Sequence, residues 1–193
     1  MNNISFKQYR AIDLGIMAVI LFIFEAITVL AGNWFPMQSY TLSPTTLILC
    51  IVMMRWDGFA VIHAVVGGFA FCLAGGAEPK QFAVYCIGNC FALLGLIFLK
   101  VCGKERVRNK IPFIFAYVVI VFTAVQVGRW AVSLFFGDPL NSIVSFFLAD
   151  SLSLLFAAVA VLISRKLDGL FEDQKHYLIR TEEERMRERN SME

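Results

Sequence analysis

Long apolar runs recur along this sequence with only short polar segments between them, and they restrict the chain to a fold within a lipid bilayer. Hydrophobic residues make up 59% of the 193 residues and the mean hydropathy is +0.70, both above the usual range of a soluble domain. About 20 mostly apolar helical residues cross a hydrocarbon core. The runs therefore predict an all-α, polytopic membrane protein with six transmembrane helices in one bundle, at residues 11–31, 42–54, 58–75, 81–99, 111–136 and 140–164.

The start of the chain and its cysteines add little to this fold. The apolar run after residue 10 has no small-residue cleavage site and leads into further spans, so we expect it to be retained rather than removed as a signal peptide. Four of the five cysteines lie within apolar runs, where sulfur packs as a small hydrophobe. Cys86 and Cys90 share a helical face but have no neighbouring ligands, and metal sites usually need more than two. We expect neither a disulfide framework nor a metal site.

Basic residues are distributed unevenly among the predicted loops. The segment after the fourth span holds five of them. Others lie before the first span, in the turn between the second and third spans, and at the start of the tail, whereas the loops on the other side of the membrane hold only Lys80. Because excess Lys and Arg stay on the cytoplasmic side of short loops, both termini are predicted to be cytoplasmic. The uncharged first loop, residues 32–43, which carries Trp34, is then expected on the outside.

The last 29 residues differ from the rest in composition. Residues 165–193 hold seven Lys or Arg and eight Asp or Glu. Such near-zero net charge gives little attraction to anionic surfaces, which argues against a nucleic-acid partner. We expect a transmembrane domain of residues 1–164 followed by a cytoplasmic, partly helical charged tail of residues 165–193.

Three charged residues fall well inside predicted spans, where a charge costs about 2.5–3.5 kcal/mol by some scales. They are Glu25, Arg129 and Asp150. At about 1.5 Å per residue, the first two lie roughly 9 Å below the outer surface and Asp150 lies near the midplane. Helical spacing places Gln126 on the face of Arg129, and places Tyr85 on one face with Asn89.

Polar groups and aromatic rings thus gather in the outer half of three spans, which is typical of a small-molecule pocket. The candidate substrate-binding residues are Glu25, Trp34, Tyr85, Asn89, Gln126, Arg129 and Asp150. An alternative is that Arg129 pairs with Glu25 or Asp150 only to hold the bundle together. We expect His63 to be a packing histidine.

Motifs of soluble enzymes are missing from the sequence. It has no HExxH pair, no phosphate loop and no nucleophile elbow, and its two histidines lie far apart. We therefore expect a protein that is not an enzyme and needs no cofactor. A membrane enzyme acting on lipids ranks last, because no paired carboxylates mark a cytoplasmic helix end.

Small residues on the first span form a candidate docking face. Ala11, Gly15 and Ala18 fall on one side of its cytoplasmic half. In lipid, helices associate where small residues allow their backbones to approach closely. A partner helix could bind there.

These features together resemble the substrate-binding S components of energy-coupling factor (ECF) vitamin transporters. The size and the six-span layout with both termini inside agree with that family, and Ala11-x-x-x-Gly15 is similar to its Ala-x-x-x-Ala motif. Residues 53–60, Met-Met-Arg-Trp-Asp-Gly-Phe-Ala, followed by Gly67-Gly68 and Gly75-Gly76, resemble its short second span, basic turn and glycine-rich third span.

The resemblance implies a protein of the bacterial plasma membrane that captures a vitamin or related micronutrient from outside. Its partners would be an ECF coupling membrane subunit, which docks on Ala11, Gly15 and Ala18, and an ATPase pair that supplies the energy. The S component would topple in the bilayer to release its cargo. The alternative is a structural membrane scaffold similar to the MreD-type rod-shape proteins, which needs no pocket.

Overall fold

The computed structural model describes residues 5–32, 34–35 and 40–192, and every regular element in these residues is helical. The all-α prediction is confirmed. The α-helices are α1 (Phe6–Gly32), α2 (Thr45–Trp56), α3 (Ala60–Gly75), α4 (Pro79–Asn89), α5 (Gly95–Cys102), α6 (Lys104–Asn109), α7 (Ile111–Phe135), α8 (Ser142–Ala149), α9 (Ser151–Ser164) and α10 (Gln174–Met192). Two 3₁₀ segments, η1 (Asp57–Phe59) and η2 (Cys90–Leu94), join α2 to α3 and α4 to α5.

Several helical stretches are long and apolar enough to cross a membrane. Four such stretches occur in the described residues, namely Phe6–Gly32, Thr45–Gly75, Pro79–Cys102 and Ile111–Phe135. The pair α8 and α9 makes a fifth if it is counted as one span, although it bends by 43°. The protein is thus a multi-helix membrane protein by composition and helix length.

The stretch from Thr45 to Gly75 folds back on itself at η1. The Thr45 side chain, at the start of α2, occupies the place where a β-carbon on Gly67 of α3 would lie. The reversal begins at Asp57, whose φ of 51° is in the left-handed region. The two helices are therefore antiparallel, with the turn where the sequence predicted one.

Helix α2 lies at the centre of the bundle. All of its residues except Leu47 are buried, and its 12 residues span only about 18 Å. A helix enclosed by protein does not have to match the thickness of the lipid, because its neighbours rather than the bilayer surround it. This accounts for the shortness of the second apolar run.

Close backbone approaches hold α3, α4 and α7 together. A β-carbon on Gly68 would lie 2.7 Å from the Tyr85 carbonyl carbon, and one on Gly88 would lie 2.6 Å from the Arg129 α-carbon. In lipid such approaches replace the hydrophobic driving force, since lipid tails are as apolar as the side chains. Glycine at these positions places α4 directly against α7, and so brings Asn89 and Arg129 within reach of each other.

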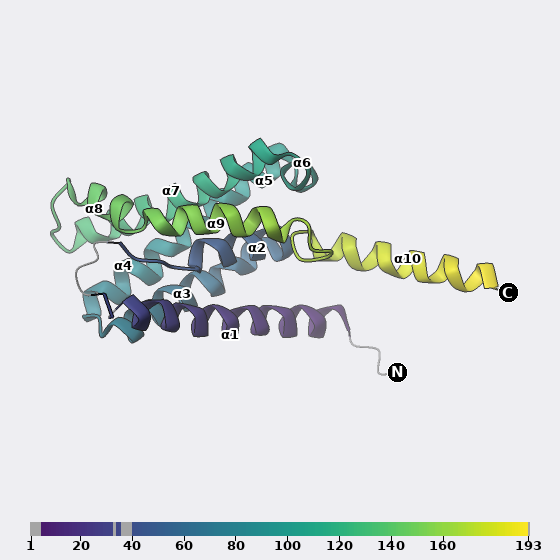
Figure 1. Ribbon diagram of the computed structural model, residues 1–193, viewed down its shortest axis with the longest axis horizontal. Helices are drawn as coiled ribbons and strands as arrows, with labels where there is room; N and C mark the ends of the chain where they lie inside the picture. Colours follow the sequence, from purple (N-terminus) through teal and green to yellow (C-terminus); the bar gives the residue numbers. More distant parts are fainter. Residues whose placement is uncertain (1–4, 33, 36–39, 193) are drawn as a thin grey trace.

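Helix α1 lies at the edge of the bundle (Figure 1) and buries only one stripe, formed by Leu14, Leu21 and Glu25. Their spacing of seven and four residues keeps them on one face. The remaining surface carries exposed apolar side chains such as Ile16 and Phe24. Most of α1 is thus free to face lipid or a partner helix.

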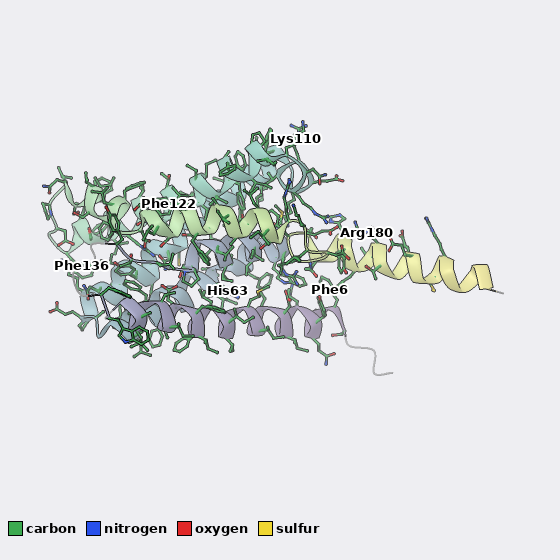
Figure 2. All side chains as sticks on the ribbon, viewed as in Figure 1. Phe6, His63, Lys110, Phe122, Phe136 and Arg180 are labelled. Carbon is green, nitrogen blue, oxygen red and sulfur yellow. The ribbon has the colours of Figure 1, made fainter. Side chains whose placement is uncertain are left out.

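The first turn of α1 and helix α10 lie at one end of the bundle, together with the α2–α3 turn and α6 (Figure 1). We call this the terminal end, and we call the opposite end, which holds residues 76–78 and 136–141, the distal end. Figure 2 shows Phe6, Lys110 and Arg180 toward the terminal end and Phe136 at the distal end. The basic loop segment of residues 100–110 lies at the terminal end. The uneven distribution of basic residues along the sequence therefore corresponds to a difference in charge between the two ends of the bundle.

The segment between α9 and α10 anchors the tail to the bundle. Residues 165–173 form turns rather than a continuation of the helix. Phe171 is buried beside Tyr117, and Arg55 donates hydrogen bonds to the carbonyl oxygens of Gly169 and Leu170. Arg55 also forms an ion pair with Asp13 at 2.7 Å. The beginning of the tail is therefore part of the folded core, whereas we expected only a partly helical charged tail from residue 165 onward.

Two predicted spans are interrupted within the bundle. The stretch expected as one helix at 81–99 passes through the 3₁₀ segment η2, and the one expected at 140–164 breaks between α8 and α9. Sequence periodicity does not register such breaks, because an apolar residue fits a helix and a 3₁₀ turn equally well.

Candidate functional site

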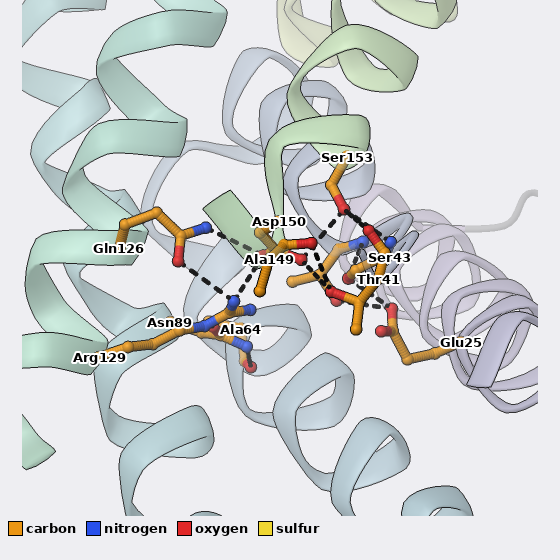
Figure 3. A network of polar contacts seen from close by, with 11 residues as sticks. Glu25, Thr41, Ser43, Ala64, Asn89, Gln126, Arg129, Ala149, Asp150 and Ser153 are labelled. Carbon is orange, nitrogen blue, oxygen red and sulfur yellow. Dashed lines mark hydrogen bonds and ion pairs between the residues drawn. The ribbon is translucent and has the colours of Figure 1, made fainter. Parts of the chain in front are cut away.

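An ion pair between Arg129 of α7 and Asp150 lies at the centre of a polar network inside the bundle (Figure 3). Its atoms Nη1 and Oδ2 are 2.6 Å apart, and the two side chains are only 5% and 6% exposed. Few ion pairs are buried this deeply unless further hydrogen bonds satisfy their remaining atoms. The surrounding side chains supply those bonds.

Asp150 sits at the break between α8 and α9. Its Oδ2 also accepts a hydrogen bond from Gln126 at 2.9 Å, and its Oδ1 accepts from Thr41 at 2.9 Å and from Ser153 at 3.1 Å. The break leaves the Ala149 carbonyl free to accept a bond from the Thr41 amide at 2.7 Å. Backbone that leaves the helical pattern inside a membrane protein is tolerated where protein partners satisfy it, as they do here.

Two further groups, besides Asp150, hold Arg129. Its Nε donates to Asn89 Oδ1 at 2.8 Å, and Asn89 donates in turn to the Ala64 carbonyl at 3.2 Å. The guanidinium lies over the Tyr85 ring, 4.6 Å from its centroid, and that ring stacks on Phe71. A desolvated guanidinium gains from such a ring face. The cation is thereby fixed from three sides.

Glu25 joins the network from α1. Its Oε2 accepts hydrogen bonds from Ser43 at 3.0 Å and from Thr45 at 2.8 Å. The Ser43 amide donates to Ser153 Oγ at 2.8 Å, and Ser153 contacts Asp150. The chain of contacts therefore runs from Glu25 to Asp150 and Arg129. Figure 3 shows Glu25 on one side of Asp150, and Arg129 with Gln126 on the other.

The structure brings most of the sequence-predicted site residues together. Tyr85, Asn89, Gln126, Arg129 and Asp150 are in direct contact around the ion pair, and Glu25 is connected through hydroxyl groups. Trp34 is the exception, because its side chain is 80% exposed and lies outside the network. Of the two pairings considered for Arg129, the one with Asp150 is observed.

Three hydroxyl residues of the network beside α2 escaped the sequence analysis, namely Thr41, Ser43 and Thr45. They lie just before or at the start of α2, where no helical periodicity marks a face. The signal that could have found them is their density, since Thr41 to Thr46 holds four hydroxyl residues directly before an apolar run. Hydroxyl groups at the start of a buried helix can donate hydrogen bonds to carboxylates, which only accept.

The predicted docking face on α1 is open. Ala11 and Gly15 are exposed and Ala18 is half-buried, and no atom lies within 4 Å of a β-carbon built on Gly15. A partner helix could therefore approach the backbone of α1 there without moving any described residue.

His63 and the cysteine pair show ordinary packing contacts. His63 is fully buried and its Nε2 lies 3.1 Å from the Leu14 carbonyl oxygen. Cys90 contacts the Cys86 carbonyl at 3.3 Å. Within the part of the chain that the structure describes, no group of three or more His, Cys, Asp or Glu residues could hold a metal ion.

Two cavities lie at the terminal end, away from the ion pair. One of about 650 Å³ lies between the α5–α6 turn and α10 and is lined by Lys104, Arg108, Glu172 and Arg180, among others. Most of its charges are already paired, Arg108 with Glu172 at 2.8 Å and Arg180 with Glu172 at 3.0 Å. These ion pairs connect the tail to the bundle and leave few charges in the lining for a ligand.

Comparison of this chain with protein-family models, with curated proteins and with solved structures found no match.

Proposed function

We propose that this chain is the membrane-embedded substrate-binding (S) subunit of an ECF-type importer, which captures a vitamin or related micronutrient from outside a bacterial cell. The observation that carries the proposal is the buried Arg129–Asp150 network, built from four elements far apart in the sequence. Charged groups inside a bilayer are costly and usually serve a function. The protein itself performs no chemistry, and partner subunits supply the energy.

The proposal includes six membrane spans. Helix α1, helix α2, helix α3, the stretch α4–α5, helix α7 and the bent pair α8–α9 each form one span, and α2 is the short one enclosed by the others. The terminal end, with its many basic residues, faces the cytoplasm of a bacterial cell, and the distal end faces outward. This orientation places the ion pair on the side from which a nutrient arrives.

Topology can be tested by labelling single cysteines in intact cells. A label at Asp138, which is about one-third exposed at the distal end, should react from outside, whereas one at Arg106 in the basic segment should not. The reverse pattern would invert the protein and remove the support for an outward-facing site.

The ligand suited to this site carries a carboxylate. Arg129 already binds a carboxylate through one nitrogen, and a ligand carboxylate could replace Asp150 with a bidentate pair. The Tyr85 and Phe71 rings beside the guanidinium provide a flat apolar wall for the rest of a small molecule. Opening would require α8 to separate from α7, and the break at Asp150 supplies a hinge.

The open face of α1 serves the coupling membrane subunit, which in turn binds the ATPase pair. Gly15→Leu places a branched side chain where a partner backbone would approach. Since nothing lies within 4 Å of that position, the fold and the ligand site should be unaffected. We expect co-purification with the coupling subunit to be lost while ligand binding persists, and Gly15→Ala, the matched control, to keep both. An intact complex in the leucine variant would refute this docking assignment.

A structural scaffold similar to the MreD-type rod-shape proteins is the second candidate. One observation favours it, namely that Arg129 and Asp150 satisfy each other and leave no charged group of the ion pair free. A scaffold would bind no small molecule. Ligand binding by the purified protein therefore separates the two functions.

A further inference from the structure

Glu25 is the second carboxylate of the buried network, and among the described residues it has no ion-pair partner. Its side chain is 0% exposed. The only cation of the network, Arg129, is 2.6 Å from Asp150. If all three groups were ionised, the network would hold two negative charges and one positive charge, and its burial would leave the excess charge poorly screened by solvent.

The groups that face Glu25 from the neighbouring elements do not supply a second cation. The charged groups that act on Glu25 are Arg129 of α7 and Asp150 at the α8–α9 break. The other ionisable groups that interact with its charge, Tyr85 of α4 and Cys72 of α3, carry no positive charge. Among the described residues, helix α2 and residues 40–44 present only the neutral hydroxyl groups of Ser43 and Thr45 to Glu25. An uncompensated buried charge is costly enough that such a group usually neutralises instead.

The hydrogen bonds around Glu25 are unequal. Oε2 accepts from both Ser43 and Thr45, whereas the buried Oε1 has no hydrogen-bond partner in the residues that the structure describes. An ionised carboxylate carries its charge on both oxygens and needs donors at both. A neutral carboxyl group has one carbonyl oxygen that accepts and one hydroxyl oxygen, and an unpaired neutral group costs less than an unpaired charge.

We propose that Glu25 is a proton-binding site, protonated on Oε1 at neutral pH, and that this proton makes the group Glu25, Arg129 and Asp150 electrically neutral. In this state Oε2 acts as the carbonyl oxygen that accepts both hydroxyl bonds. Glu25 then does not compete with Asp150 for the guanidinium. Loss of the proton would add a second negative charge within the network and weaken the hold of Asp150 on Arg129.

This inference goes beyond the proposed function, since it concerns the ligand-free protein and applies to an importer and a scaffold alike. Infrared spectroscopy of the purified full-length chain in lipid nanodiscs tests it, because a protonated carboxyl group has a carbonyl stretch well separated from the carboxylate bands. At pH 7 and without ligand, the wild type should show this band. It should be lost in Glu25→Gln and kept in Asp138→Asn, the exposed control.

A second measurement avoids any dependence on the folding of the glutamine variant. Wild-type protein labelled with ¹³C-glutamate should show the band shifted to lower frequency, since the signal belongs to a glutamate, whereas labelled aspartate should leave it in place. A wild type without the band, a band that survives in Glu25→Gln, or a band that shifts with aspartate labelling would each overturn the proposal. A thermal midpoint raised specifically by sodium over choline would also overturn it, because a sodium ion would then provide the neutralising charge.

Discussion

Asp150→Asn removes one charge from the centre of the network while it leaves the size of the side chain nearly unchanged. Asp150 accepts from Gln126 and Arg129 through Oδ2 and from Thr41 and Ser153 through Oδ1. An amide has one acceptor oxygen and one donor NH₂ group. With the NH₂ group in the place of Oδ2, Gln126 and Arg129 would face another donor. With it in the place of Oδ1, Thr41 and Ser153 would have to turn their hydroxyl groups to accept from it.

The expected loss is large for a single isosteric change. Removing one partner of a buried ion pair costs about 3–5 kcal/mol, because the other charge is left uncompensated. For a chain of this length, each kcal/mol lowers the thermal midpoint by about 2–4 °C. We therefore expect Asp150→Asn to unfold about 6–20 °C below the wild type in detergent, measured by tryptophan fluorescence.

Asp138→Asn provides the matched control, since it makes the same chemical change in an exposed pair. Lys80 and Asp138 are about one-third exposed, and exposed pairs contribute only about 0–1 kcal/mol. Its thermal midpoint should fall by less than about 4 °C. Adding Arg129→Gln to Asp150→Asn should cost less than the sum of the single losses, because the two residues interact directly. Equal losses in Asp150→Asn and Asp138→Asn would refute the reasoning.

Other changes follow from single contacts. Gly88→Ala forces a β-carbon against the α7 backbone and should cost about 1–3 kcal/mol by overpacking, whereas Gly15→Ala should be neutral in the same melt. Phe171→Ala empties a buried site and should cost about 3–5 kcal/mol; an unchanged midpoint would mean that the tail does not anchor there. Partial burial opposes ionisation of Asp173, but the hydrogen bond and charge of Lys104 outweigh it and hold the pKa of Asp173 below its ordinary value. The stabilisation by Asp173 is therefore present above the unfolded-state pKa of that carboxyl and is lost as pH falls through the folded-state value. The thermal midpoint of the Asp173→Asn variant, measured at decreasing pH, should not show this decrease in stability.

Much of the fold was predictable because lipid imposes a simple pattern. Apolar runs located nearly all of the helices, and the charged turn at Arg55 to Asp57 separated α2 from α3. The breaks at η2 and Asp150 were not predictable, since hydrophobicity does not distinguish a helix from a 3₁₀ turn. The burial of Phe171 was also missed, because a single aromatic residue in a charged tail shows no period.

The site was predictable where helices carry it and not where loops do. Helical phase placed Gln126 beside Arg129 and Tyr85 beside Asn89, since residues three or four apart share a face. It could not place Ser43, which lies in an irregular segment whose path depends on tertiary contacts. Trp34 also lies in an irregular segment, and the sequence pattern could not predict that its side chain is exposed.

We propose that Arg129 exchanges its internal carboxylate for that of a ligand. The most direct measurement is a thermal-shift screen of carboxylate-bearing vitamins and related micronutrients on purified wild-type protein and on Arg129→Ala. A ligand present at about 1,000 times its Kd stabilises the folded state by about 4 kcal/mol, which is roughly 8–16 °C for a chain of this size. We predict at least one compound that gives such a rise in the wild type and a much smaller one in Arg129→Ala. A screen in which no compound stabilises the wild type, or in which the variant responds equally, would contradict the claim.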